Sequence, residues 1–166
     1  MSKTHPKKYQ HYSVGDFDSY DCLKLSKRFY LVLMFILRGY IVWLMSVTNM
    51  RDRVGFISWI YPETSLFYLS LISGAVGLFV VLIISLRRPE AASWVKISWQ
   101  HCRTILTMAL LFDLLSHVVG YVYWDLFSLE WIIVQVIVSS ALISLCYTSE
   151  RFKINLEEFP QKVPEK

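Results

Sequence analysis

Four long apolar segments constrain this chain more than any other feature of its sequence. They cover residues 29–49, 64–86, 99–121 and 126–148. An α-helix rises about 1.5 Å per residue, so each segment is long enough to cross the ~30 Å hydrocarbon core of a bilayer. Lipid offers the backbone no hydrogen-bond partners, so each segment is expected to be helical. The sequence therefore predicts an all-α membrane protein, a four-transmembrane-helix bundle.

The composition supports a lipid bilayer as the main partner of this chain. Hydrophobic residues make up 55% of the 166 residues and charged residues only 18%, whereas soluble domains carry about 25% charged residues. The net charge of +4 comes from basic residues that flank the apolar segments. Such flanking charges indicate membrane orientation, and no motif suggests nucleic-acid binding.

The distribution of lysine and arginine predicts the orientation of the bundle. Fourteen of these residues lie on one side of the predicted spans and two, Arg51 and Arg53, on the other. Positive charge accumulates in cytoplasmic segments. We therefore expect a cytoplasmic N-terminal segment (1–28), a four-span domain (29–148) and a cytoplasmic C-terminal tail (149–166). The first span is expected to act as an uncleaved signal anchor in the bacterial inner membrane.

A short segment between spans one and two is predicted to lie along the membrane surface. Residues 54–61 are too few to cross a bilayer, and they include Trp59 and Tyr61. Amphipathic aromatic rings favour the depth of the lipid headgroups. The sequence does not decide whether this interfacial segment is a helix or a loop.

Three ionisable residues lie well inside the predicted spans: Arg38, Asp113 and His117. A charge near the bilayer centre is costly and usually faces a partner. Arg38 and Asp113 are expected at depths within about 5 Å of each other, at about 1.5 Å per residue. We therefore predict an ion pair between spans one and three. His117 follows Asp113 by one helical turn on the same face, where it can contact either Asp113 or Tyr121.

This intramembrane polar cluster has two interpretations at the level of sequence. In the first, Arg38 and Asp113 tether two spans and fix their packing. In the second, Asp113 and His117 form a proton or ion relay of the kind found in small transporters. No continuous polar path to the cytoplasmic side is visible in the sequence, and this favours the tether.

Small residues four apart predict where helices approach closely. Segment 64–86 contains Ser70, Ser73, Gly74 and Gly77, and segment 126–148 contains Ser140 and Ser144. Small side chains allow membrane helices to pack at short distance. These residues indicate interfaces, either within the bundle or between copies of the chain.

Signals for catalysis, cofactors and metals are absent from the sequence. No metalloprotease, serine-hydrolase or phosphate-binding motif is present. The three cysteines are widely spaced and predict neither disulfides nor a metal site. The acidic residues Asp16, Asp18 and Asp21 could attract a divalent cation, but we expect them to cap or solvate the start of a helix. We therefore predict no enzyme activity, no cofactor and no bound metal.

Several segments in fixed order resemble a known family. These segments are "DFDSYDCLKLSKRFYLVLMFILRGY", "WIYPETSLFYLSLISG", "SLRRPEAASWVKISWQHCRTILTMALLFDLL" and "LEEFP". The chain resembles the YfeZ-like group of small inner-membrane proteins of γ-proteobacteria, which contain a domain of unknown function. The resemblance includes Arg38, Arg103 and Asp113. It implies a four-span inner-membrane protein and supplies no reaction or substrate.

The sequence thus predicts a structural or accessory membrane protein that acts through helix packing. Its expected partners are the bilayer and either another membrane protein or further copies of the chain. The alternative is a small transporter that handles protons or ions through Asp113 and His117.

Overall fold

The computed structural model describes residues 9, 12–18, 20, 22–49, 53–61, 64–124 and 128–161. Within these residues the fold is helical, with only an isolated antiparallel bridge between Phe17 and Leu23. The elements in chain order are η2 (Val14–Asp16), α1 (Lys27–Ile36), α2 (Arg38–Thr48), α3 (Arg53–Ile60), α4 (Thr64–Ser85), α5 (Ser93–Gln100), α6 (Cys102–Trp124), α7 (Leu129–Thr148) and α8 (Glu150–Glu157).

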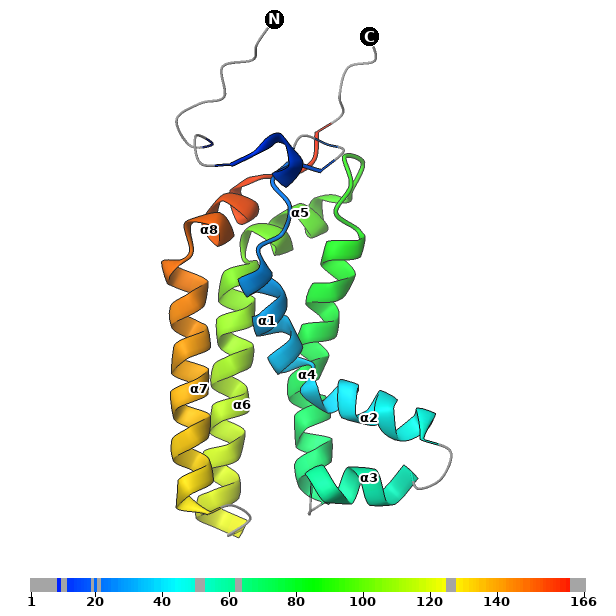
Figure 1. Cartoon of the computed structure of the whole chain (residues 1–166), viewed down its shortest axis with the longest axis vertical. Helices are drawn as coiled ribbons and strands as arrows, with labels where there is room; N and C mark the ends of the chain where they lie inside the picture. Colours follow the sequence, from blue (N-terminus) through cyan, green and yellow to red (C-terminus); the bar gives the residue numbers. More distant parts are fainter. Residues whose placement is uncertain are drawn as a thin grey trace, which may run out of the picture.

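Three long helices form the body of the molecule. They are α4, α6 and α7, and they are long and apolar enough to cross a membrane. The three helices run along the long axis of the molecule, and α1 packs against all three at one end (Figure 1). Side chains from these helices and from α1 share one core, in which Phe29, Leu106 and Leu110 are fully buried. The structure is therefore compatible with a helical membrane protein.

The first span predicted for residues 29–49 is not one continuous helix in the structure. The helix breaks at Leu37, and α1 and α2 are bent by 69° relative to each other. With 10 residues, α1 is about 15 Å long and reaches only half the ~30 Å depth of a bilayer core. Then α2 turns away from the bundle (Figure 1). The described part of the chain has a fourth candidate span only if this bent pair counts as one.

Small residues on α4 make room for the break. Ser70, Ser73, Gly74 and Gly77 are all buried. A Cβ atom on Gly74 would lie 2.9 Å from the Tyr40 ring and 3.1 Å from the Ile36 carbonyl oxygen. The absence of side chains at these glycines lets the backbone at the break rest directly on the surface of α4.

The segment predicted to be interfacial is the helix α3. It packs against α2, and the two form a hairpin that projects from the bundle (Figure 1). At the hinge with α4, the Tyr61 hydroxyl lies 3.0 Å from Ser70 Oγ. This contact joins the end of the hairpin to the α4 surface on which the break rests.

The two ends of the chain meet at one end of the bundle. The predicted C-terminal tail contains α8, which packs on α5 and beside the N-terminal segment (Figure 1). Asn155 is fully buried, and its amide donates to Leu23 O (2.7 Å) and accepts from Ser26 N (3.1 Å). The Trp99 indole donates to the carbonyls of Asn155 and Glu158 at 3.0 and 3.1 Å. These contacts place both ends of the described chain on the same side.

Replacing Gly74 by alanine should destabilise the fold by about 1–3 kcal/mol. The added Cβ would press on the Ile36 carbonyl, which is backbone and cannot rotate away. Thermal unfolding in mild detergent should show a lower Tm. Ala75→Val is the matched control, because Ala75 is exposed on the same helix, and it should leave the Tm unchanged. Equal Tm values for all three proteins would contradict this packing.

Candidate functional site

The site is centred on Asp113, which lies at the middle of α6 (Cys102–Trp124). Eleven residues on either side place its Cα about 16 Å from each end of the helix, at about 1.5 Å per residue. The residue is only 3% exposed. An ionised carboxylate at such a position requires hydrogen-bond donors and a compensating charge.

Side chains from three other helices supply these donors. Arg38 Nη2 donates to both carboxylate oxygens of Asp113, each at 3.0 Å. Ser73 Oγ on α4 donates to Oδ1 at 3.1 Å. Gln135 Nε2 on α7 donates to Oδ2 at 2.7 Å. The carboxylate thus accepts four hydrogen bonds from residues of α2, α4 and α7. These bonds satisfy the hydrogen-bonding capacity of its two oxygens.

His117 completes the cluster from the next turn of α6. Its Nδ1 lies 2.7 Å from the backbone carbonyl of Asp113, so Nδ1 carries the proton and donates it. Its Nε2 then faces Arg38 Nη2 at 3.5 Å as an acceptor. The distance from Nδ1 to Asp113 Oδ2 is 3.9 Å. The imidazole therefore supports the Arg38 guanidinium and does not bind the carboxylate directly.

Arg38 reaches the cluster because it is the first residue after the break. It opens α2 directly after Leu37, at the point where α1 has reached the depth of Asp113. Its Nη1 donates to the Phe35 carbonyl at 3.4 Å, and its guanidinium lies 4.5 Å from the centre of the Phe35 ring. A helix end inside a bundle leaves carbonyls without partners. Arg38 thus adds a donor to a carbonyl at the end of α1, which the capping backbone also contacts, while it compensates Asp113.

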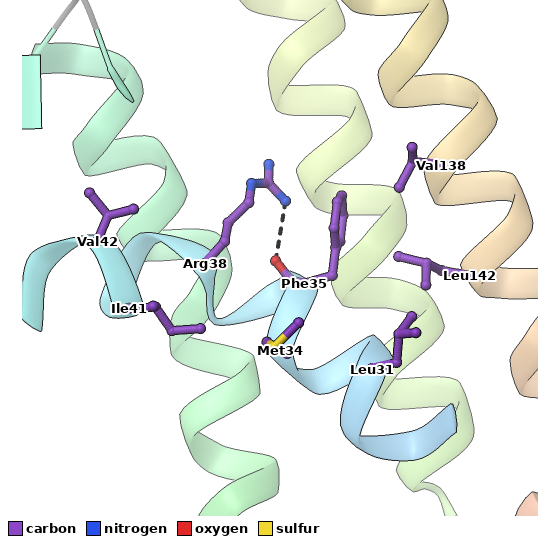
Figure 2. A pocket seen from close by; sticks show the side chains of 8 residues that line it. All are labelled: Leu31, Met34, Phe35, Arg38, Ile41, Val42, Val138 and Leu142. Carbon is purple, nitrogen blue, oxygen red and sulfur yellow. Dashed lines mark hydrogen bonds between the residues drawn. The ribbon is translucent and has the colours of Figure 1, made fainter. Parts of the chain in front are cut away.

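A groove opens beside the guanidinium between α1, α2 and α7 (Figure 2). Its volume is about 420 Å³. Figure 2 shows Phe35 standing between Arg38 and the α7 side chains. Among the described residues, Arg38 is the one charged residue that lines the groove. The other lining residues are apolar: Leu31, Met34, Phe35, Ile41, Val42, Val138 and Leu142. The Arg38 side chain is 24% exposed.

The predicted packing residues fall into two groups. Ser70, Gly74 and Gly77 face α1 and α2 inside the bundle, and Ser73 faces Asp113 on α6. Ser140 and Ser144 on α7 are exposed and lie on the face opposite the core. The structure therefore gives the first group an internal partner, whereas the second lies on the outer surface.

Sequence reasoning missed two members of the cluster. Gln135 is a lone amide in the apolar α7 helix, and Ser73 was predicted only to allow close packing. Their polarity could have indicated a shared partner, because a buried polar group is normally hydrogen-bonded. Their relative rotation about the bundle, which decides the partner, was not readable from one sequence.

The described residues contain no group of three or more His, Cys, Asp or Glu side chains suited to a metal ion. Asp16 binds Arg151 at 3.2 Å, and Asp18 accepts from the backbone of Tyr20 and Cys22; Asp21 lies outside the described residues. Asp113 accepts four hydrogen bonds from three side chains, so its carboxylate is poorly placed to act as a base.

A comparison with protein families now places the chain. The model of a family of proteins of unknown function, DUF2919, matches residues 12–158. The chain belongs to the DUF2919 family. The match contains every element from η2 to α8, including the whole Asp113 cluster. No curated protein and no solved structure gives a significant match. The family description assigns the DUF2919 proteins no activity or ligand.

Removing one partner of the Arg38–Asp113 pair should cost much more than removing both. Arg38→Ala or Asp113→Ala leaves one buried charge without its counter-charge, which costs about 3–5 kcal/mol. The double substitution removes both charges and should be far milder. Denaturation in detergent micelles provides the double-mutant cycle.

Arg88→Ala provides the control for this cycle, because Arg88 is exposed. Combined with Asp113→Ala, it should give simple addition of the two free-energy changes. Additive losses for Arg38→Ala and Asp113→Ala as well would show that the pair does not stabilise the bundle.

Proposed function

We propose that this protein is a multi-pass membrane protein with a structural or accessory role and no enzymatic activity of its own. In this role it holds a fixed helical shape in the bilayer and associates with other membrane helices. The α1–α2 pair acts as a broken fourth span, with α4, α6 and α7 as the three continuous ones.

The observation that carries this proposal is the satisfied state of Asp113. The hydrogen bonds to its carboxylate join α2, α4 and α7 to α6. A group that carries protons or ions must exchange partners during each cycle. Asp113 instead has the partners expected of a fixed internal tether.

The proposed location is the bacterial inner membrane, with both termini in the cytoplasm. The positive-inside distribution of Lys and Arg supports this orientation. The contacts between α8 and the N-terminal segment agree with it, because they require both ends on one side. The sequence resemblance to the YfeZ-like proteins of γ-proteobacteria further supports this location.

The outer face of α7 is the proposed surface for association. Ser140 and Ser144 are exposed there between the exposed residues Ile133, Ile137 and Tyr147. Small residues flanked by large apolar ones allow close approach of a second helix, either from another protein or from a second copy. None of the described residues covers that face.

The alternative, a small carrier that uses Asp113 and His117, has weaker support. His117 Nδ1 is held by a backbone carbonyl, and Nε2 faces a guanidinium. Neither nitrogen is in direct contact with the carboxylate, as a proton relay would require. A pH-sensitive dye inside proteoliposomes distinguishes the two functions: an accessory protein gives no proton flux, whereas flux that Asp113→Asn abolishes would establish the carrier.

The accessory role predicts an assembly larger than the monomer. Ser140→Leu with Ser144→Leu should reduce it, because the larger side chains separate the helices. The assembly is measured as the mass of the protein after gentle solubilisation, together with the identity of any stoichiometric component. Ser65→Leu, on an exposed site of α4, is the control and should keep the assembly. A monomer before any substitution would contradict the proposal.

Reporter fusions at the two termini should both report the cytoplasm. A fluorescent protein that folds only inside the cell should be bright at either end, and a phosphatase active only in the periplasm should be inactive. A periplasmic C-terminus would overturn both the orientation and the count of four crossings.

A further inference from the structure

We infer that the groove beside Arg38 binds an apolar molecule that carries a neutral carbonyl oxygen, with an alkylated quinone as its chemical class. The carbonyl accepts a hydrogen bond from Arg38, and the apolar part lies along α1 and α7. This inference requires the bilayer placement proposed above, but it does not depend on the accessory role.

Arg38 has hydrogen-bond donors that its known partners do not use. A guanidinium has five N–H donors. The two on Nη2 are shared between the Asp113 carboxylate and His117 Nε2, and one on Nη1 is directed at the Phe35 carbonyl. Within the described residues, the Nε donor and the second Nη1 donor have no acceptor. The Arg38 side chain lines the groove and is 24% exposed, so these donors are within reach of a bound molecule.

The charge of Arg38 is already compensated, and this favours a neutral ligand. Asp113 already compensates the guanidinium at 3.0 Å, and an added anion would also lie close to that carboxylate. The remaining donors therefore favour a neutral acceptor such as a ketone oxygen. A neutral acceptor satisfies the two free N–H groups without a second buried charge.

The depth of Arg38 in the bilayer limits which molecules can reach it. Arg38 binds the residue at the middle of α6, about 16 Å from each end at about 1.5 Å per residue. The ester and phosphate groups of phospholipids lie near the membrane surface, about 15 Å from the centre of a ~30 Å core. They cannot bring an oxygen to Arg38 while their headgroups stay in water. A molecule dissolved in the hydrocarbon core can.

The size and lining of the groove suit a flat ring with an alkyl tail. The groove holds about 420 Å³, which is within the range of sites for small organic ligands. Phe35 and Met34 both line the groove (Figure 2). Aromatic rings and thioethers pack well against flat conjugated rings. A planar quinone head with an alkyl tail matches this lining better than an aliphatic chain alone.

The test uses the purified full chain in phosphatidylcholine nanodiscs. The probe is a radiolabelled 1,4-benzoquinone with a decyl chain, and empty nanodiscs give the background. Protein-specific, saturable binding is expected. Unlabelled decylbenzene, which has the same tail but no carbonyl, should compete at least about tenfold more weakly, as expected for the loss of one hydrogen bond. Dodecanoate, the anionic probe, should also compete more weakly than the quinone.

Two methionine substitutions locate the site. Met34→Trp fills the groove at a position that is 62% exposed, so the fold should tolerate it. It should weaken quinone binding at least about tenfold. Met45→Trp is the matched control on the exposed side of α2, outside the groove, and should bind as the unsubstituted protein does. Gel filtration establishes that both variants are folded.

Each remaining outcome overturns the inference. Equal competition by decylbenzene would show a groove that takes apolar chains only. Stronger competition by dodecanoate would show an anion site. An absence of saturable binding, or an unchanged affinity in Met34→Trp, would show that the quinone does not occupy this groove.

Discussion

The hydrogen bonds to the Asp113 carboxylate are the interaction on which the rest of this fold depends. They join Arg38, Ser73 and Gln135, each from a different helix, to the centre of α6. A charge at that depth is tolerated only when it is compensated and hydrogen-bonded. The bundle satisfies this requirement by breaking its first helix, so that Arg38 is the first residue after the break.

The broken helix in turn explains the shape of the bundle. Because α1 ends halfway along the bundle, α2 leaves it and folds back as the α2–α3 hairpin. The same break leaves a space between α1, α2 and α7, which is the groove lined by Arg38. One carboxylate therefore accounts for the tether between helices, the projecting hairpin and the one charged group of the groove.

Much of this arrangement was predictable from the sequence, and the rest depended on tertiary contacts. Segment length and apolar content predicted the helices α4, α6 and α7, and residue spacing brought Arg38 and Asp113 to one depth. The break was not predictable, because residues 29–49 contain no proline and Gly39 is only a weak signal. It depends on tertiary contacts, namely the Arg38–Asp113 pair and the small-residue surface of α4 that makes room for the break. The partnership of Asn155 with Leu23 spans 132 residues, and no local pattern indicates it.

A distance between the far ends of α2 and α6 tests the central claim most directly. Spin labels at Val47→Cys and Val122→Cys, both exposed sites, can be placed in a protein whose native cysteines are replaced by serine. We expect a long, narrowly distributed distance, which becomes broad when Asp113→Leu removes the tether. A short distance, as for two parallel neighbouring spans, or a distribution that Asp113→Leu leaves unchanged, would contradict it.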